Sequence, residues 1–462
     1  MTFKEENDAF LASMLNARFF DVWKKDDRSP HSLWSETDLE IYLTANCNQH
    51  CEYCYLTKFK GLYPKEFDNQ ETVLKNLKVF FDWCIKEGYS IHKLEFFTGE
   101  IWAYEYGLKV LQITIDAIKR GFRVSEIMIP SNCSFILSRT QTNLIQNYID
   151  DFNRRGVRLM FSISVDGKEL ETKTRPLNNG KDLEKNDSFY ELLFAFAYHN
   201  NFCFHPMVSS ISVNKWVENF KWFEKMCAEY NMDVERYVMM LEVRNDDWTD
   251  ETIREYLKFL DYLIERKFAK CGKNVENFAD VLFNLKYAGG MDGYINYALP
   301  FADTFQGCTV SNTLTVRMGD LAIAPCHRTA YDQFLYGKYT TGDDGQITGI
   351  EANNTQMAVR VLYSNSIICS NGCDVCRYNS FCMRGCYGSQ YENTGDPFMP
   401  IPSVCKLFKS KWKFIISKYK DMGLLKYLSS IDEYDMSYQL AQSVVKKCEV
   451  ILNDGSEYVK LG

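Results

Sequence analysis

Three cysteines fall within eight residues near the amino end of the chain, at Cys47, Cys51 and Cys54. Thiols this close in the sequence are expected to serve one centre. The run before them, residues 39–44, alternates apolar and polar residues as a β-strand does. The cysteines therefore occupy a loop that leaves a strand end, which is where a parallel α/β barrel carries its chemistry.

The spacing of these cysteines favours an iron–sulfur cluster over zinc. Three thiolates can hold three irons of a 4Fe–4S cube and leave the fourth iron open to a small molecule, because such clusters normally take four cysteines. A closed zinc site uses four ligands, commonly in pairs with two residues between them. No fourth cysteine lies near this loop, and His50 is expected to point in a different direction from the three thiols.

The loop resembles the signature of the radical S-adenosylmethionine (SAM) superfamily, Cys-x3-Cys-x2-Cys with an aromatic residue, here Tyr53, before the last cysteine. The resemblance implies that Cys47, Cys51 and Cys54 bind a 4Fe–4S cluster whose open iron chelates SAM, with Tyr53 in the cofactor site. In that family one electron cleaves SAM, and the resulting 5′-deoxyadenosyl radical removes a hydrogen atom from the substrate.

Composition limits the class of protein. The chain has 462 residues, 46% hydrophobic and 25% charged, which is typical of a globular protein with two or three domains. A net charge of −8 argues against a nucleic-acid partner, which would need a basic face. The N-terminus is acidic, and no apolar run approaches the roughly 20 residues that span a bilayer. We expect no membrane partner and a cytoplasmic location, where cysteines stay reduced and bind metal.

From residue 39 to about 245, apolar strands alternate with amphipathic helices, as in successive βα units. The expected strands are 39–43, 93–97, 126–130, 158–165, 203–209 and 236–242, with helices that include 71–86, 108–120 and 214–230. The resemblance implies an α/β fold, a partial (β/α)6 TIM-type barrel that forms the radical SAM core, followed by a small cysteine-rich domain.

We divide the chain into five segments on this basis. They are an N-terminal helical extension at 1–38, the partial barrel at 39–245, bridging helices at 246–305, a cysteine-rich domain at 306–410 and a C-terminal helical segment at 411–462. Within the bridging segment 246–305, we expect residues 250–270 to form a helix with Thr249 as its N-cap.

The segment Thr98-Gly99-Glu100, after the second expected strand, resembles the Gly-Gly-Glu segment of the family, with Thr98 in place of the first glycine. In the family role, Gly99 lets the backbone approach the cofactor and Glu100 accepts a hydrogen bond from the SAM ammonium group. Taken alone, Glu100 could equally be a capping acid at a strand-to-helix turn.

Two later strands also end in polar residues. Ser131 and Asn132 correspond to the segment that lies near the ribose in the family, although both are common turn residues. Ser164 and Asp166 resemble a Ser-x-Asp-Gly pattern and are expected at the polar edge of the cofactor, with Arg175 near the substrate mouth. The alternatives are a simple turn for Asp166 and a surface ion pair for Arg175.

The last third of the chain resembles a SPASM domain, the extension that carries auxiliary iron–sulfur clusters in radical SAM enzymes that modify peptides. Seven cysteines match its pattern: Cys308, Cys326, Cys373, Cys376, Cys382, Cys386 and Cys405. The family pattern assigns Cys373, Cys376, Cys382 and Cys405 to one cluster and Cys308, Cys326 and Cys386 to another. The fourth ligand of the second cluster would be Cys369 or a group of the substrate. A zinc ribbon would account for Cys373 and Cys376 alone.

The resemblance implies a maturase that installs a thioether, carbon–carbon or carbon–oxygen crosslink in a ribosomally made precursor peptide, with the auxiliary clusters as electron acceptors. Anaerobic sulfatase-maturating relatives, which form formylglycine, carry an acidic residue after the cysteine that corresponds to Cys326. This chain has His327 there, which weighs against that activity.

The partners implied are the precursor peptide and a flavodoxin- or ferredoxin-type reductant. Residues 1–38 are too few for a leader-reading module, so a reader of the leader peptide would be a separate protein or another surface of this chain. An alternative from another class is a non-catalytic iron–sulfur electron carrier, but such a protein would not need Glu100, Ser131 and Asn132 after successive strands.

Overall fold

The computed structural model describes residues 3–15, 19–24, 38–59, 62, 69–97, 99–103, 106–178, 187–283, 313–352, 361, 372–373, 375–379, 381–382, 385–456 and 458–461. The chain forms two compact units. Unit 1 comprises Met1–Val165, Arg175–His205 and Thr309–Ile367, and unit 2 comprises Asp166–Thr174, Pro206–Cys308 and Ile368–Gly462.

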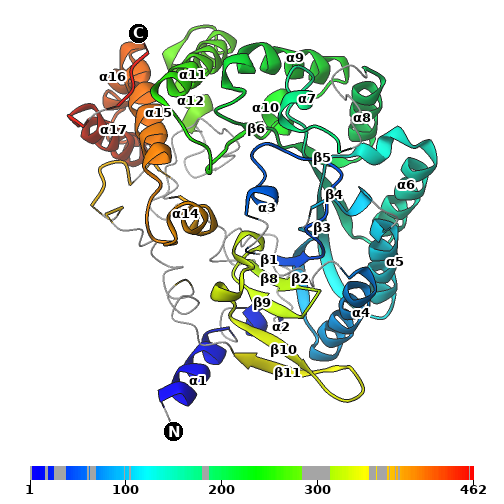
Figure 1. Ribbon diagram of the computed structural model, residues 1–462. Helices are drawn as coiled ribbons and strands as arrows, with labels where there is room; N and C mark the ends of the chain where they lie inside the picture. Colours follow the sequence, from blue (N-terminus) through cyan, green and yellow to red (C-terminus); the bar gives the residue numbers. More distant parts are fainter. Residues whose placement is uncertain are drawn as a thin grey trace. The chain divides into compact units, whose positions relative to one another are not determined.

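Unit 1 is built on a nine-stranded sheet of order β11-β10-β9-β8-β1-β2-β3-β4-β5 (Figure 1). Its strands are β1 (Asp38–Tyr42), β2 (Ser90–Glu95), β3 (Arg123–Ser131), β4 (Arg158–Ile163), β5 (Asn201–Phe204), β8 (Thr313–Arg317), β9 (Ala322–Ala324), β10 (Gly337–Thr341) and β11 (Ile347–Ala352). Strands β1 to β5 are parallel, and β8 adds to β1 in the same direction. The predicted α/β fold with a partial parallel barrel is confirmed.

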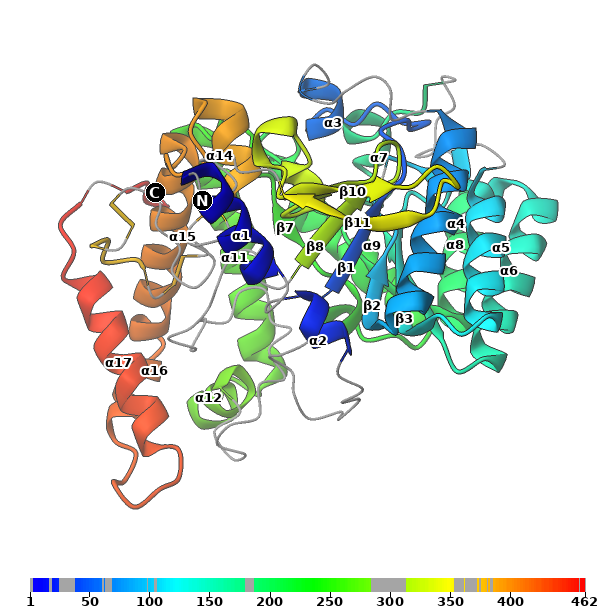
Figure 2. The ribbon, with the colours of Figure 1, turned by 90° about the horizontal axis from the view of Figure 1, so that it is seen from below.

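The two faces of this sheet differ in polarity because side chains alternate along each strand. Leu39, Leu94 and Ile127 lie on one face of the sheet by register and are fully buried. Helices α4 (Gln70–Glu87), α5 (Tyr106–Lys119), α6 (Arg139–Arg154) and α8 (Asp187–His199) lie along the sheet (Figures 1 and 2). On the opposite face the register places Glu40 of β1 between Glu95 of β2 and Thr315 of β8. This inner face is polar, as expected for the lumen of an open barrel.

The fifth and sixth expected strands differ from the prediction. Residues 203–209 are divided between β5 in unit 1 and β6 (Met207–Val208) in unit 2, with Pro206 between them. Proline has no N–H to donate to a sheet ladder, so it interrupts the strand. Residues 236–242 begin in α10 (Val234–Tyr237), where the Asp233 side chain caps the helix, and only β7 (Leu241–Glu242) is extended.

Residues 313–352 lie in the same compact unit as the strands of residues 39–204, although the sequence places them with the cysteine-rich segment at 306–410. The reason is that β8 pairs with β1 along its whole length, from Asp38↔Thr313 to Tyr42↔Arg317. All five residues of β8 are buried. The short helices of unit 1 are α1 (Phe3–Leu15), α2 (Asp21–Lys24) and α3 (Tyr55–Lys58).

Unit 2 is mostly helical, and β6 and β7 form a two-stranded parallel sheet within it. Its helices are α7 (Glu171–Thr174), α9 (Trp216–Glu229), α10, α11 (Asp250–Lys270), α12 (Val275–Phe283), α14 (Tyr387–Thr394), α15 (Pro402–Asp421), α16 (Leu424–Ser429) and α17 (Tyr438–Leu452). Helix α11 begins at Asp250 with Thr249 as N-cap, as the sequence predicts. No helix among the described residues is long and apolar enough to cross a membrane.

A charge cluster on α10 and α11 provides a pH-dependent contribution to the stability of unit 2. Burial raises the pKa of Glu235, but Lys267, Arg266 and Lys270 outweigh it and lower the pKa to about 2. Because the folded pKa lies below the unfolded one, the contribution is present above the unfolded pKa and is lost as the pH falls toward 2.

We expect Glu235→Gln to lower the free energy of unfolding by about 1–2 kcal/mol at pH 7, allowing for solvent screening. Urea unfolding across pH should show the difference shrinking as the pH falls from about 4.5 toward 2. Glu229→Gln, at an exposed pair with Lys225, is the matched control and should change little at any pH. A pH-independent difference for Glu235→Gln would refute the electrostatic explanation.

Candidate active site

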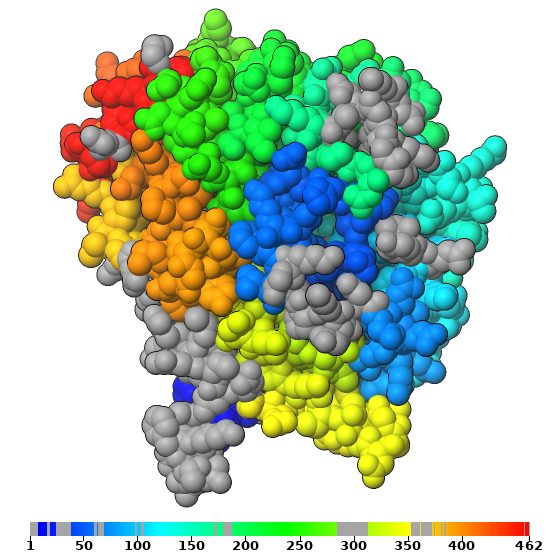
Figure 3. Space-filling model, viewed as in Figure 1, coloured from blue at the N-terminus to red at the C-terminus, as the bar shows by residue number. Residues whose placement is uncertain are grey.

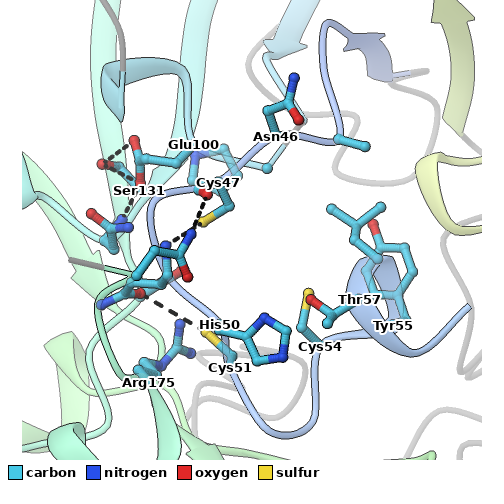
Figure 4. A pocket seen from close by; sticks show the side chains of 18 of the residues that line it. Asn46, Cys47, His50, Cys51, Cys54, Tyr55, Thr57, Glu100, Ser131 and Arg175 are labelled. Atoms are coloured by element: carbon cyan, nitrogen blue, oxygen red, sulfur yellow. Dashed lines mark hydrogen bonds between the residues drawn. The ribbon is translucent and has the colours of Figure 1, made fainter. Parts of the chain in front are cut away.

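A cavity of about 520 Å³ opens at the carboxyl ends of the parallel strands in unit 1. The three cysteines of the loop after β1 line it, and their sulfur atoms border the same space (Figure 4). The blue atoms of this loop are exposed in the space-filling view (Figure 3). Its lining residues are Ala45, Asn46, Cys47, Gln49, His50, Cys51, Cys54, Tyr55, Leu56, Thr57, Phe97, Gly99, Glu100, Pro130, Ser131, Asn132, Ser164, Arg175 and Asn178.

The cysteine loop is held by a second segment, residues 175–178. The His50 N–H donates to the Pro176 carbonyl at 2.9 Å, and the Asn178 N–H donates to the Asn48 carbonyl at 2.9 Å. The Asn178 amide also donates to the Cys47 carbonyl at 3.0 Å. These bonds satisfy backbone groups of an irregular loop and fix the positions of its thiols.

Gly99 packs directly against the backbone of the cysteine loop. Its N–H donates to the Thr44 carbonyl at 2.8 Å, and the Glu100 N–H donates to the Asn46 carbonyl at 2.9 Å. A Cβ atom on Gly99 would lie 2.2 Å from the Asn46 carbonyl oxygen, so no larger residue fits without moving the backbone.

We therefore expect Gly99→Ala to displace the loop, to destabilise the protein by about 1–3 kcal/mol and to reduce its capacity for iron. Gly349→Ala is the control, because its Cβ would meet only the Thr340 hydroxyl at an ordinary 3.5 Å. Thermal unfolding and iron content after anaerobic reconstitution measure both effects. Equal behaviour of the two variants would show that the close approach of Gly99 does not matter.

Glu100 is a buried carboxylate in the cavity wall, with 1% of its surface exposed. It accepts hydrogen bonds from the Asn132 N–H at 2.6 Å, the Ser131 hydroxyl at 3.1 Å and the Trp102 N–H at 3.2 Å. Burial raises its pKa to about 7, although these hydrogen bonds oppose the rise. The donors fix the orientation of the carboxylate and explain why polar residues at the end of β3 accompany it.

The end of β3 is also joined to the cysteine loop through Asn48. The Asn132 amide donates to Asn48 Oδ1 at 2.8 Å, and the Asn48 amide donates to the Ser134 hydroxyl at 2.7 Å. The Ser164 N–H donates to the Ser131 carbonyl at 2.7 Å, which brings Ser164 to the cavity. The predicted residues at three successive strand ends thus line one cavity with the thiols.

Arg175 lines the cavity with only 7% of its surface exposed. Its guanidinium lies over the Tyr53 ring, 5.3 Å from the ring centroid. Tyr53, which was predicted in the cofactor site, is buried under this guanidinium and is not one of the residues that line the cavity. A cation at this position is suited to bind a carboxylate.

Asp166, which was predicted at the edge of the cofactor, does not line this cavity. Asp166 belongs to unit 2, where its carboxylate accepts hydrogen bonds from the Thr174 hydroxyl at 2.7 Å and the Met207 N–H at 2.9 Å. Both of its oxygens therefore hold the segment 166–174 in place. Thr98 and Cys308 lie outside the described residues.

The residues that the sequence reasoning missed are mainly asparagines. Asn48 and Asn178 make the hydrogen bonds that shape the loop, and Asn46 and Phe97 line the cavity. The sequence gives only a weak indication of these residues. Asn46 and Asn48 could have been noticed because they flank Cys47, but Asn178 is separated from Cys47 by 131 residues.

The arrangement of the thiols fits an iron–sulfur cluster. Among the described residues, no three His, Cys, Asp or Glu side chains converge as ligands of a single metal ion would. A cubane presents a different iron to each thiolate, so its ligands border a space and do not meet at a point. Burial and the charge of Glu100 raise the pKa of the Cys47 thiol to about 12, so metal coordination would be needed to deprotonate it at neutral pH.

The remaining predicted ligands belong to both units. Cys326 is buried in unit 1, at the end of β9, whereas Cys373, Cys376, Cys382, Cys386 and Cys405 belong to unit 2. Burial raises the pKa of Cys405 to about 11, and the neighbouring Cys373 and Cys376 contribute to the rise. These three thiols therefore lie near one another, as one auxiliary cluster requires. Cys369 lies outside the described residues.

Solved structures of the anaerobic sulfatase-maturating enzyme anSMEcpe share this fold. The native enzyme with bound AdoMet superposes with a TM-score of 0.53 at 15% identity, covering 83% of this chain and 98% of that chain. The complex with AdoMet and the Cp18Cys peptide gives a TM-score of 0.51 at 14% identity, with the same coverage. No protein-family model and no curated protein matches the chain. At this level of identity the similarity establishes the fold.

Proposed function

We propose that this protein is a radical SAM enzyme that modifies a peptide. The observation that carries the proposal is the single cavity at the strand ends, where Cys47, Cys51 and Cys54 share the wall with the carboxylate of Glu100 and the guanidinium of Arg175. The fold shared with an AdoMet-bound enzyme supports it. An electron carrier would need the thiols but neither the cavity nor the two charged groups.

Each group of residues in the cavity would have its own role in binding the cluster and the cofactor. The three thiolates hold three irons, which leaves one iron for the cofactor. Glu100, oriented by its three donors, would accept a hydrogen bond from the SAM amino group, and Arg175 is placed to bind a carboxylate. When bound, the reduced cluster supplies the electron that cleaves SAM into methionine and a 5′-deoxyadenosyl radical. Ser131, Asn132 and Ser164 offer polar groups for the remainder of the cofactor.

We further propose that the substrate is a ribosomally made precursor peptide and that the product is a crosslink. The complex of anSMEcpe with a peptide supports a peptide substrate for this fold. Cys373, Cys376, Cys382 and Cys405 would hold one auxiliary cluster, and Cys308, Cys326 and Cys386 would hold another. These clusters would accept the electron released from the substrate radical. A flavodoxin- or ferredoxin-type protein would supply the reducing electron, and a separate protein would bind the leader of the peptide.

Formylglycine formation is the second candidate, because the structures of the same fold come from a sulfatase-maturating enzyme. The residue after Cys326 argues against it. That residue is His327, and its ring Nδ1 lies 3.0 Å from the Glu40 carboxylate. Crosslink formation therefore remains the preferred activity.

Incubation of the reconstituted, reduced protein with SAM and short peptides encoded beside its gene tests both activities. Crosslinking predicts 5′-deoxyadenosine together with a peptide that has lost two hydrogens, resists fragmentation between the joined residues and does not react with a hydrazide. Formylglycine predicts a hydrazide adduct. Deoxyadenosine with an unchanged peptide would refute the crosslink proposal.

The second auxiliary cluster is proposed to have an open iron that holds a substrate thiolate or amide. In that case Cys369→Ala should keep the full iron content and an unchanged Mössbauer spectrum. Loss of one cluster from this variant would instead make Cys369 the fourth ligand. Cys405→Ala, in the group with Cys373 and Cys376, is the positive control for cluster loss.

A further inference from the structure

The cavity of unit 1 has two ends, with the three thiols between them. Glu100, Ser131 and Arg175 lie on one side of the thiols, whereas Tyr55 and Thr57 lie on the other side (Figure 4). The first end offers a carboxylate, a hydroxyl and a guanidinium, and we call it the polar end. The second end, which is bordered by aromatic rings, is called the aromatic end.

Two side chains that follow β2 diverge toward these two ends. The Glu100 carboxylate turns toward the end of β3, where it accepts from the Ser131 hydroxyl and the Asn132 N–H. The Phe97 ring instead stacks on His327, which follows β9, with ring centroids 3.4 Å apart. Since β3 and β9 lie on opposite sides of β2 in the sheet, Phe97 and Glu100 border different ends of the cavity.

The rings of Phe97, His327 and Tyr55 form one cluster. The centroid of the His327 ring lies 6.2 Å from that of Tyr55, and both Tyr55 and Phe97 line the cavity. The Arg328 guanidinium lies over the Tyr55 ring, 4.7 Å from its centroid. Neither His327 nor Arg328 is among the residues that line the cavity, so they support the two lining rings from behind.

The segment behind the rings is anchored to the sheet. The buried Glu40 carboxylate of β1 accepts from the His327 N–H at 2.7 Å and pairs with the ring Nδ1 at 3.0 Å. Glu40 also accepts from the Thr315 hydroxyl of β8. Buried Arg317 donates to the Ala330 carbonyl at 2.8 Å. A wall that is fixed in this way loses little conformational entropy when a ligand packs against it.

The proposed cofactor accounts for the polar end. The amino and carboxylate groups of SAM would suit Glu100 and Arg175, and its ribose hydroxyls would suit Ser131 and Asn132. The substrate must reach the radical in the same cavity, and the aromatic end lies on the other side of the thiols. A reactive radical also needs a site without water, and an apolar side chain packed on Phe97 would exclude it.

We propose that Tyr55 and Phe97 form a specificity subsite for a large apolar side chain of the peptide substrate, close in sequence to the residue that is modified. This inference rests on the proposed function. It deepens that function because it states a chemical feature that the peptide must carry.

Selection from a random peptide library displayed on mRNA tests the subsite without a known substrate. The target is the anaerobically reconstituted, full-length protein with SAM. Wild type should enrich large apolar residues, namely Leu, Ile, Met or Phe, at one position about tenfold over Ser or Asn.

Two substitutions of Phe97 change the size of the subsite in opposite directions. Phe97→Ala enlarges it, so the enriched side chain should become larger than in wild type. Phe97→Trp narrows it, so the enriched side chain should become smaller, with about tenfold changes in relative enrichment. A variant that merely folds poorly would weaken the binding of all peptides without changing the preferred size.

Trp83→Ala is the matched control. Trp83 is a half-buried ring on α4 that contacts Tyr339, with centroids 6.5 Å apart, and it does not line the cavity. This variant should keep the preference of the wild type. The proposal would be overturned if wild type showed no apolar preference, or if the preferred size were the same in Phe97→Ala and Phe97→Trp.

The adenine ring of SAM is the competing occupant of the aromatic end. If adenine packed on Phe97, the Phe97→Ala substitution would weaken SAM binding in the absence of peptide and leave the preference of the selected peptides unchanged. Equilibrium dialysis of labelled SAM, together with the selection, detects this outcome, which would also overturn the proposal.

SAM cleavage by the reduced wild-type protein reports separately on the proposed function. Cleavage without an apolar preference in the selected peptides would reject the subsite alone. An apolar preference that responds to the size of residue 97, in a protein that does not cleave SAM, would reject the radical chemistry and leave the subsite in place.

Discussion

Replacing Cys47, Cys51 and Cys54 together with alanine is expected to abolish SAM cleavage and to remove about four irons from the reconstituted protein. The three thiols border one cavity, and no other described cysteine lines it. Because they would be the protein ligands of the SAM-binding cluster, their loss removes the electron source for cleavage. Iron analysis and chromatography of 5′-deoxyadenosine measure the two effects, and we expect a loss in rate of at least about 1000-fold.

The matched control replaces three buried cysteines that do not line the cavity, Cys84, Cys227 and Cys448. These thiols pack as small hydrophobic side chains, so their replacement by alanine should leave the iron content and the cleavage rate nearly unchanged. Undiminished iron or cleavage in the variant that lacks Cys47, Cys51 and Cys54 would contradict the assignment of the site.

Glu100→Gln is expected to weaken SAM binding by about 100-fold, which corresponds to about 2.7 kcal/mol. The substitution removes the carboxylate that would accept a hydrogen bond from the cofactor amino group. It also replaces one acceptor oxygen by an NH2 group that must face the N–H of Asn132 or Trp102, or the Ser131 hydroxyl. Equilibrium dialysis of labelled SAM against the reconstituted protein measures the affinity.

Glu126→Gln serves as the control for this experiment. Glu126 is also a buried acid on a strand of unit 1, but it pairs with Arg158 and does not line the cavity. It should bind SAM as the wild type does. Equal affinities of the Glu100→Gln and Glu126→Gln variants would show that the Glu100 carboxylate does not contact the cofactor.

The parts of the fold that follow local rules were predictable. Period-two alternation located β1, apolar runs between amphipathic helices located β2 to β4, and helical periodicity located α4, α5 and α9, because each pattern reflects how the element is buried. That Cys47, Glu100, Ser131 and Ser164 share one cavity was also predictable from the sequence, because the carboxyl ends of parallel strands meet at one edge of a sheet.

The parts that depend on long-range pairing were not predictable. Nothing local to β8 indicates that it joins β1, from which it is separated by more than 270 residues. The contact of residues 175–178 with the cysteine loop consists mainly of backbone hydrogen bonds, which leave little trace in side-chain identity. Asp166 illustrates the same difficulty, because its motif resembled a cofactor contact and its carboxylate instead bonds Thr174 and Met207.

We propose that a cluster held by Cys47, Cys51 and Cys54 offers its open iron to SAM. Electron–nuclear double resonance of the reduced protein, with SAM labelled by 15N at its amino group and by 17O at its carboxylate, tests this coordination. We expect both labels to couple to the cluster and both couplings to vanish in the variant that lacks the three cysteines. A cluster signal that is indifferent to labelled SAM would contradict it.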